Sequence, residues 1–282
     1  MRRAWKALGL ALAAVVGLCA ALVIAIAIAP HPAIEARPGP AVPGLFHVHA
    51  EASHDGFGTL DEATRAAAEA GARFLFLTEH NVVRPDAPVV RDGVLVVPGV
   101  EISAQAGHVI ALGLSEAPPQ PERGEAVLEA IARRGGLAVL AHPVNLRRPW
   151  SDPSTDGFAG FEALSLDSWF REAKALAPWR LALALAAIGD LPKGAALLAT
   201  RPDGALARYD EIAARRDVTL LCGVDAHGLP PYAASFGALR LFVPVALSGE
   251  PQADAAALIE AIRAGRTFCS VPALGDARRK AR

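Results

Sequence analysis

The stretch Phe74-Leu75-Phe76-Leu77-Thr78-Glu79-His80 begins with four large apolar residues, then turns polar and ends in an acid and a histidine. A short apolar run of this kind is typical of a strand buried on both faces. The same pattern recurs along the chain, where apolar runs end in Glu101, His142, and the pair Asp225 and His227. The pattern predicts several buried strands that each deliver an ionisable side chain at one end.

Ala-rich segments with helical periodicity alternate with these runs. We expect strands at residues 45–50, 73–78, 94–100, 108–114, 137–141, 160–166 and 218–224, and helices at residues 60–70, 122–134, 168–176, 206–216 and 253–264. Thr59 and Glu62 have the spacing of a capping box at the start of the first of these helices. This βαβα order predicts an α/β fold with a largely parallel sheet or barrel.

Imidazoles and carboxylates are concentrated at the predicted strand ends. His47 and His49 lie two residues apart, so on a strand both face the same side, and His108 opens the strand that follows Gly107. The C-terminal ends of parallel barrel strands meet at one face, where these groups would converge. So many would be costly to desolvate together without cations, and the number of nitrogen and oxygen ligands favours two or three Zn, Mn or Fe ions.

The order of these motifs resembles the PHP (polymerase and histidinol phosphatase) family. The resemblance covers residues 45–270 and rests on His47-Val48-His49, Ser53-His54-Asp55-Gly56, Thr78-Glu79-His80-Asn81, Gly99-Val100-Glu101, Gly107-His108, Ala141-His142-Pro143 and Gly223-Val224-Asp225-Ala226-His227. It implies a distorted (β/α)7 TIM-like barrel and a trinuclear metal site that hydrolyses phosphoesters.

The resemblance also implies which residues hold each metal. The first metal takes His47, His49, Glu101 and Asp225; Glu101 bridges to a second, held by His108 and His142; the third takes His80, His227 and a ligand from residues 53–56. That turn departs from the commonest pattern, because His54 stands where an acid is expected and Asp55 follows it. Either could bind, and the spacing favours His54. Glu79 replaces the usual aspartate and is expected to support the ligands from outside.

Such a site would hydrolyse a phosphoester with a hydroxide that bridges two cations. Arg84, Arg147 and Arg148 follow two of the motifs and are candidates to hold the phosphate of a small phosphorylated substrate. Residues 145–160 form a candidate substrate-contacting loop. Two alternatives stay open: hydrolysis of a carboxylic or carbamic ester by the same metals, and a non-catalytic metal-binding protein.

The beginning of the chain differs from the rest. Residues 7–29 carry no charge and are long enough to cross ~30 Å of hydrocarbon, and Arg2, Arg3 and Lys6 precede them. We expect a cytoplasmic end at residues 1–6, a transmembrane anchor at 7–29, a Pro-rich linker at 30–44 and an exported catalytic domain at 45–282, on the periplasmic or outer face. A cleaved signal peptide and a secreted domain are the alternative.

Residues 175–200 form a second apolar stretch. Arg180, Asp190 and Lys193 interrupt it, and Pro178 and Pro192 would break a single long helix. We expect buried helices here rather than a second span, with a place on the membrane surface as the alternative.

The composition excludes several classes of protein. The 282 residues include 28 Lys+Arg and 29 Asp+Glu, so no basic excess favours stable nucleic-acid binding. Three of these basic residues and none of the acids lie in residues 1–30, which leaves the remaining chain mildly acidic. The 3 cysteines exclude a disulfide scaffold. Cys222 is expected as a small buried residue, with a bond to Cys269 in an oxidising compartment as the alternative.

Overall fold

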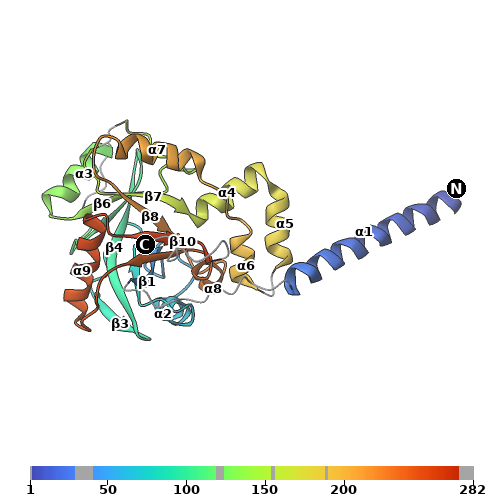
Figure 1. Ribbon diagram of the computed structural model, residues 1–282, viewed down its shortest axis with the longest axis horizontal. Coiled ribbons are helices and arrows are strands. Elements are labelled where there is room, and N and C mark those ends of the chain that lie inside the picture. The colour runs from blue at the N-terminus through green and yellow to red at the C-terminus, as the bar shows by residue number, and fades with distance from the viewer. Residues whose placement is uncertain (1, 29–40, 119–123, 154–155, 188–189, 273–282) are drawn as a thin grey trace.

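The computed structural model describes residues 2–28, 41–118, 124–153, 156–187 and 190–272 (Figure 1). Its strands are β1 Val42–Val48, β2 Phe74–Leu77, β3 Val89–Arg91, β4 Val94–Ala104, β5 Gly107–Leu112, β6 Leu137–Ala141, β7 Gly160–Ser165, β8 Thr219–Gly223, β9 Arg240–Val243 and β10 Phe268–Ser270. Its helices are α1 Arg2–Ile28, α2 Leu60–Glu69, α3 Gly124–Arg133, α4 Leu166–Leu176, α5 Pro178–Ala186, α6 Leu191–Ala196, α7 Asp203–Ala213, α8 Tyr232–Phe236 and α9 Pro251–Arg263.

Neighbouring strands form one sheet that is nearly closed into a barrel. The strand order is β10-β9-β1-β2-β4-β5-β6-β7-β8, and β3 pairs with β4. A parallel bridge between Val48 and Ala226 brings the end of β1 against the segment after β8. The His49 amide donates to the Ala226 carbonyl oxygen at 2.9 Å, which closes the ring of strands from β1 to β8. The fold is therefore mixed α/β with a barrel-like sheet.

The apolar strand runs fill the interior, as the sequence predicts. The core contains Phe46, Phe74 and Phe76, and these rings make edge-to-face contacts. Helix α2 begins after Thr59, whose side chain accepts from the Glu62 amide while the Glu62 side chain accepts from the Thr59 amide. The capping box predicted there is confirmed.

The expectation of a largely parallel sheet is wrong around β5. This strand is antiparallel to both β4 and β6, and β9 runs antiparallel to β1 and to β10. Only Gln105 and Ala106 connect β4 to β5, and a connection that short can join antiparallel strands only. The hairpin places His108, at the start of β5, opposite Ser103 near the end of β4.

Several boundaries also differ from the prediction. Strands β3, β9 and β10 and helix α8 are not predicted from the sequence, because three to five residues each are too few to show a periodicity. Strand β1 begins at Val42, inside the predicted linker, because Val42, Pro43 and Gly44 pair with β9. Gly44 lies against the Phe74 ring, where a Cβ would overlap it. Residues 29–40 of the predicted linker and the predicted helix start at residue 122 lie outside the described residues.

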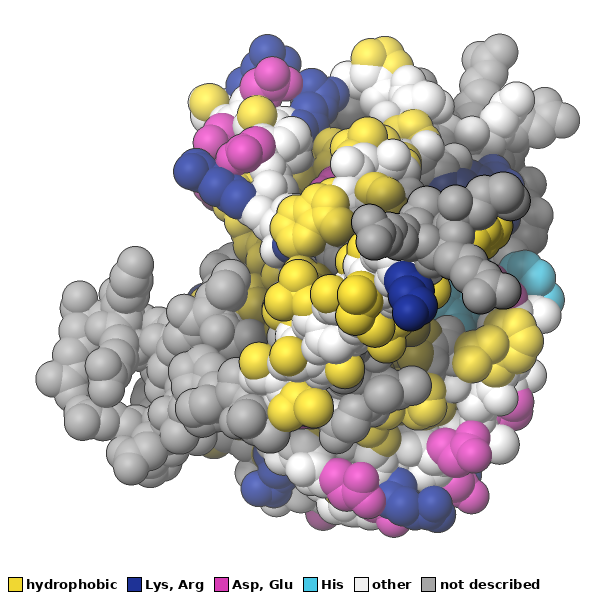
Figure 2. Space-filling model, turned by 90° about the vertical axis from the view of Figure 1, so that its right-hand side faces the viewer, with side chains coloured by type: hydrophobic (Ala, Val, Ile, Leu, Met, Phe, Trp, Pro, Cys, Tyr) yellow, Lys and Arg dark blue, Asp and Glu magenta, His cyan; other side chains and the backbone are white. Residues whose placement is uncertain are grey.

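Helices α4, α5 and α6 form a lobe on the side of the barrel toward α1 (Figure 1). The prediction of helices broken near Pro178 and Pro192 is confirmed, since α5 and α6 begin there. The expectation that they are buried is wrong for α5, which has no buried residue. Figure 2 views this side of the molecule with α1 projecting toward the viewer, so the hydrophobic side chains gathered at its centre include those of α1; charged groups lie at its upper left and lower margins.

Helix α1 is exposed to its surroundings over residues 5–22. Within the described residues it is the one helix with the length and apolar composition needed to cross a membrane. Helices of this kind near an N-terminus serve either as membrane anchors or as signal sequences.

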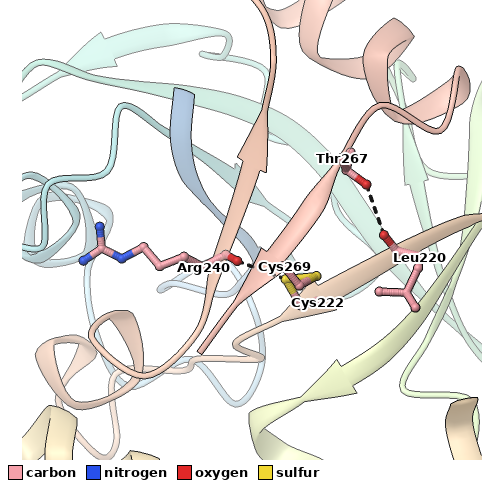
Figure 3. Close-up of a disulfide and its surroundings, with 5 residues drawn as sticks. All are labelled: Leu220, Cys222, Arg240, Thr267 and Cys269. Carbon is pink, nitrogen blue, oxygen red and sulfur yellow. Dashed lines mark hydrogen bonds between the residues drawn. A yellow bond between two sulfur atoms is a disulfide. The ribbon is translucent and has the colours of Figure 1, made fainter. Parts of the chain in front are cut away.

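A disulfide joins β8 to β10 (Figure 3). Cys222 and Cys269 are 47 residues apart in sequence, and their Cα atoms lie 5.9 Å apart. Beside it the Thr267 hydroxyl donates to the Leu220 carbonyl oxygen at 3.1 Å. The alternative in which these cysteines pair is thus the one observed, and the bond fixes β10 against the strand that leads to Asp225.

Candidate metal centre

The ionisable residues of the sequence motifs gather at one end of the barrel. His49, His80, His142, Asp225 and His227 follow β1, β2, β6 and β8, whereas His47 lies in β1, Glu101 in β4 and His108 at the start of β5. The backbone at His47, His142 and Asp225 has φ of 66°, 31° and 47°. Such values are rare for residues other than glycine, and backbone strain of this kind is concentrated at functional sites.

Glu101 lies at the centre of the cluster and is fully buried. Its Oε2 lies 3.1 Å from His47 Nε2, 3.2 Å from His49 Nε2 and 3.3 Å from His80 Nδ1. Its Oε1 lies 2.7 Å from His108 Nδ1 and 3.2 Å from His142 Nε2. The two carboxylate oxygens therefore face two different sets of imidazoles, so each oxygen could serve as a metal ligand together with its own set.

One set of ligand atoms has the spacing that a divalent cation requires. His47 Nε2 and His49 Nε2 each lie 3.4 Å from Asp225 Oδ1 and close to Glu101 Oε2. With metal–ligand bonds of about 2.0–2.2 Å, neighbouring ligand atoms lie about 3–3.5 Å apart. No described residue gives His47 Nε2, His49 Nε2 or Glu101 Oε2 a hydrogen bond, although all three atoms are buried. These residues fit a metal.

Two further groups adjoin the first. His80, Glu101 and His108 present atoms within 4.8 Å of one another, and so do His49, His80 and His227. The His142 ring stacks on that of His47, with centroids 5.6 Å apart. The cluster of histidine, glutamate and aspartate side chains could thus hold divalent metals at more than one position.

The turn after β1 distinguishes Asp55 from His54. Asp55 Oδ2 lies 3.5 Å from His80 Nε2, and Asp55 Oδ1 lies 3.6 Å from His227 Nε2. The His54 side chain is 73% exposed and approaches Asp55 at 3.8 Å. Gly56 permits the turn, because a Cβ there would overlap the Ala50 carbonyl oxygen. The geometry favours Asp55 between the two imidazoles, whereas the sequence spacing favoured His54.

Glu162, which the sequence analysis did not single out, holds two of the candidate ligands. Its carboxylate lies 3.1 Å from His47 Nδ1 and accepts from the His142 amide at 2.6 Å. It is buried inside β7, and a Cβ on Gly223 would overlap its Oε1. Accepting from His47 Nδ1 leaves Nε2 of that ring to face the cluster. An acid within the apolar run of residues 160–166 was the signal for this role.

Glu79 supports the cluster through Ser53. The Ser53 hydroxyl donates to Glu79 Oε2 at 2.6 Å and lies 3.1 Å from His49 Nδ1. Because that hydroxyl gives its proton to Glu79, it accepts from His49 Nδ1–H and leaves His49 Nε2 to face Glu101. Glu79 also accepts from the Ala50 amide at 3.0 Å. Its longer side chain reaches this position from the end of β2.

Burial and charge pairing shift the pKa values of the cluster in opposite directions. Burial lowers the pKa of His142, but Glu101 outweighs it and raises the pKa to about 9. Burial raises the pKa of Glu101, yet the surrounding histidines, His47 first, hold it well below its usual range. Burial lowers the pKa of His80 to about 4. Without cations, the cluster therefore keeps protons on some imidazoles that would have to leave when a metal binds.

A cavity of about 410 Å³ opens over the cluster. Arg147 and Arg148 line it, together with Asn145 and with Arg171 from α4, which the sequence analysis did not single out. Arg84 is not among its lining residues; its guanidinium pairs with Glu51 at 2.7 Å and with Asp86 at 3.0 Å. The described part of the loop at residues 145–160 thus contributes two arginine side chains, Arg147 and Arg148, to the cavity.

Comparisons with known proteins find similar folds but do not assign the chain to a family. No family model matches the chain. An uncharacterized protein of Methanocaldococcus jannaschii is 34% identical over 83 residues, which are 28% of this chain and 48% of the relative, so the match spans about half of that protein.

Two solved structures are similar at low identity. PsfC from Pseudomonas syringae PB-5123 has a TM-score of 0.51 at 14% identity, covering 84% of this chain and 93% of that chain. A two-domain protein of Bacteroides vulgatus ATCC 8482, described as containing a predicted PHP-like metal-dependent phosphoesterase, has a TM-score of 0.49 at 17% identity, covering 86% of this chain and 67% of that chain. The likeness to PsfC concerns the fold alone.

The contacts of Glu162 predict a role in metal affinity. Glu162→Gln keeps the shape of the side chain and removes the charge that orients His47, so we expect metal affinity to fall about 10–100-fold. Competition with a fluorescent chelator measures this. The matched control is Glu129→Gln on α3, where the carboxylate pairs with exposed Arg133. Unchanged affinity in a folded Glu162→Gln variant would contradict the role.

The raised pKa of His142 predicts proton release on metal binding. The metal-free protein holds this proton below a pH of about 9, so a cation that takes the imidazole at pH 7 must displace it. The apparent affinity of the protein for the metal should fall as the pH falls from about 9 toward 6.5. Calorimetric titration in buffers of different ionisation enthalpy should show net proton release at pH 7 and less above pH 9. Heats that do not depend on the buffer would refute this.

Proposed function

We propose that this chain is a metal-dependent phosphoester hydrolase of the PHP type that uses two or three divalent cations, Zn, Mn or Fe. The observation that carries the proposal is the position of Glu101, with five imidazoles around its two oxygens. The ligand set contains nitrogen and oxygen only, which suits these metals.

In the proposed ligand assignment, the two carboxylate oxygens of Glu101 would bind different cations. His47, His49, Glu101 and Asp225 would hold one cation, and His108 and His142 would hold a second through Glu101 Oε1. Asp55, His80 and His227 would hold a third, with Asp55 in place of His54 because of its distances to both imidazoles. Glu162 and Glu79 would act as positioning residues.

The cations supply Lewis-acid activation of water and neutralise charge on phosphoryl oxygens when they are bound. The protein contributes the rest of the site. Arg147 and Arg148 line the same cavity as the cluster and would bind the phosphate through charge-assisted hydrogen bonds. The Asn145 side chain accepts from the Arg147 amide at 2.8 Å and donates to Asp167 at 3.0 Å, which holds this loop against α4.

We further propose that the catalytic domain lies outside the cytoplasm, tethered by α1. The Cys222–Cys269 disulfide supports this location, because such bonds persist in oxidising compartments. The basic residues before the apolar segment favour a cytoplasmic N-terminus. A small phosphorylated substrate, rather than nucleic acid, fits the cavity volume and the mildly acidic domain.

Metal analysis of the purified full-length chain, combined with a substrate panel, tests the function. We expect more than one equivalent of transition metal and hydrolysis of aryl phosphate. The double variant His47→Ala, His142→Ala removes ligands from both faces of Glu101 and should lose metal and most of the activity. His31→Ala, which changes a histidine of the Pro-rich stretch, is the control.

The panel also includes a phosphate diester, a nucleotide, and aryl carboxylate and carbamate esters. Turnover of the carboxylate or carbamate esters alone would replace the proposal with the alternative hydrolase. Bound metal without turnover of any ester would favour a metal-binding protein, and a double variant that keeps metal and activity would overturn the site.

A further inference from the structure

Helix α5 presents an apolar surface that the protein leaves uncovered. Leu181 and Ala184 pack against the core from one side of the helix. Trp179 and Leu185 of the same helix are 64% and 71% exposed, and Leu176, at the end of α4, is 76% exposed. Single exposed apolar residues are ordinary, but three large ones between Leu176 and Leu185 make an apolar patch of the kind found at interaction surfaces.

Lys174 and Arg180 lie within residues 173–189, and Glu172 and Asp190 border this segment at either end. The Arg180 guanidinium donates to the carbonyl oxygens of Leu197 and Ala199, and it lies 6.0 Å from the centre of the Trp179 ring. Exposed apolar residues that include an aromatic ring beside an arginine match the boundary between the headgroups and the acyl chains of a bilayer.

The neighbouring helix indicates which partner covers the patch. Helix α1 contacts α5, and Figure 1 shows the end of α1 nearer the domain beside α5 and α6. A bilayer that contains α1 therefore has its surface close to α5. Residues 29–41 connect α1 to β1 and can reach no more than about 45 Å, so the local concentration of lipid at the patch is high. Even weak lipid affinity is then sufficient for docking.

We propose that the patch of Leu176, Trp179 and Leu185 docks on the lipid bilayer surface. In the same lobe, α4 lines the cavity over the cluster with Phe170 and Arg171, and α6 lines it with Ala195. Docking would therefore fix the orientation of the cavity relative to the membrane. The choice of a bilayer as the partner rests on the proposed anchor α1 and not on the proposed hydrolase function.

Fluorescence quenching in single-protein nanodiscs tests the proposal on the full-length chain. The discs contain phosphatidylcholine with phosphatidylglycerol, with or without nitroxide-labelled lipid. Native Cys19, the exposed free cysteine among the described residues, carries an NBD probe as the reference for α1. In a Cys19→Ser background, the probe is placed at Leu185→Cys, at Leu176→Cys and, as the matched control, at Val90→Cys, which is 48% exposed on β3.

We expect nitroxides at shallow acyl positions to remove about half or more of the fluorescence at positions 185 and 176, because docked helices lie ~5–10 Å into the interface. Val90→Cys should keep its fluorescence. Adding Trp179→Glu to the Leu185→Cys chain should restore most of the lost signal. Hydrolase activity on a soluble aryl phosphate, measured in parallel, tests the function separately.

Three results would overturn the proposal. The first is fluorescence at positions 185 and 176 that stays as unquenched as at Val90→Cys, whether or not Cys19 is quenched. The second is NBD fluorescence at positions 185 and 176 that shifts to the blue without being quenched, together with crosslinks between chains in larger vesicles. That result would mean that a second copy of the chain covers the patch. The third is quenching that Trp179→Glu does not reduce. Quenching at positions 185 and 176, in discs where nitroxides near the bilayer centre leave Cys19 unquenched, would support docking and refute the anchor.

Discussion

The buried carboxylate of Glu101 carries one negative charge into a space shared by five imidazoles and by the carboxylate of Asp225. Such a group is stable in a dry interior only when protons or cations balance its charge. In the metal-free state protons supply part of that balance, as the raised pKa of His142 shows. His47 Nε2 and His49 Nε2 are buried and receive no hydrogen bond from the described residues, and they are the atoms at which cations would replace these protons.

Much of the architecture follows from the need to place ligands around Glu101. The β4–β5 hairpin reverses the chain so that His108, at the start of a strand, reaches the same edge as residues that end strands. The bridge between Val48 and Ala226 brings His47 and His49 against Asp225. Outside the ligands, Glu162 orients the imidazole of His47 and the Ser53–Glu79 pair orients that of His49.

The sequence predicted that the candidate ligands lie together better than it predicted the directions of the strands in the sheet. His80 and His142 follow runs of apolar residues, and that pattern is visible without any structure. The direction of β5 is not predicted, because an apolar run in the sequence does not show which way its strand runs. Strands β9 and β10 are not predicted because they are short, and contacts distant in sequence hold them in the sheet: β9 pairs with β1, and the disulfide joins β10 to β8. The choice between His54 and Asp55 depends on the turn at Gly56, which spacing does not specify.

The apolar residues of α5 illustrate a different limit. Hydrophobicity alone predicts that a helix leaves water, and it does not distinguish a protein core from a bilayer. Burial is therefore the expectation for residues 175–200, whereas Trp179 and Leu185 are exposed. Glu162 was overlooked for a related reason, because a single acid in an apolar strand was treated as part of the strand. Its partner His47 lies 115 residues away in sequence.

A crystal structure of the full-length protein grown with Zn²⁺ or Mn²⁺, with anomalous differences measured on either side of the metal absorption edge, tests whether cations lie on both sides of Glu101. We predict at least two anomalous peaks that flank the Glu101 carboxylate, one shared with His47, His49 and Asp225 and one with His108 and His142. A map without peaks at Glu101, or with a single peak that does not touch it, would contradict the account.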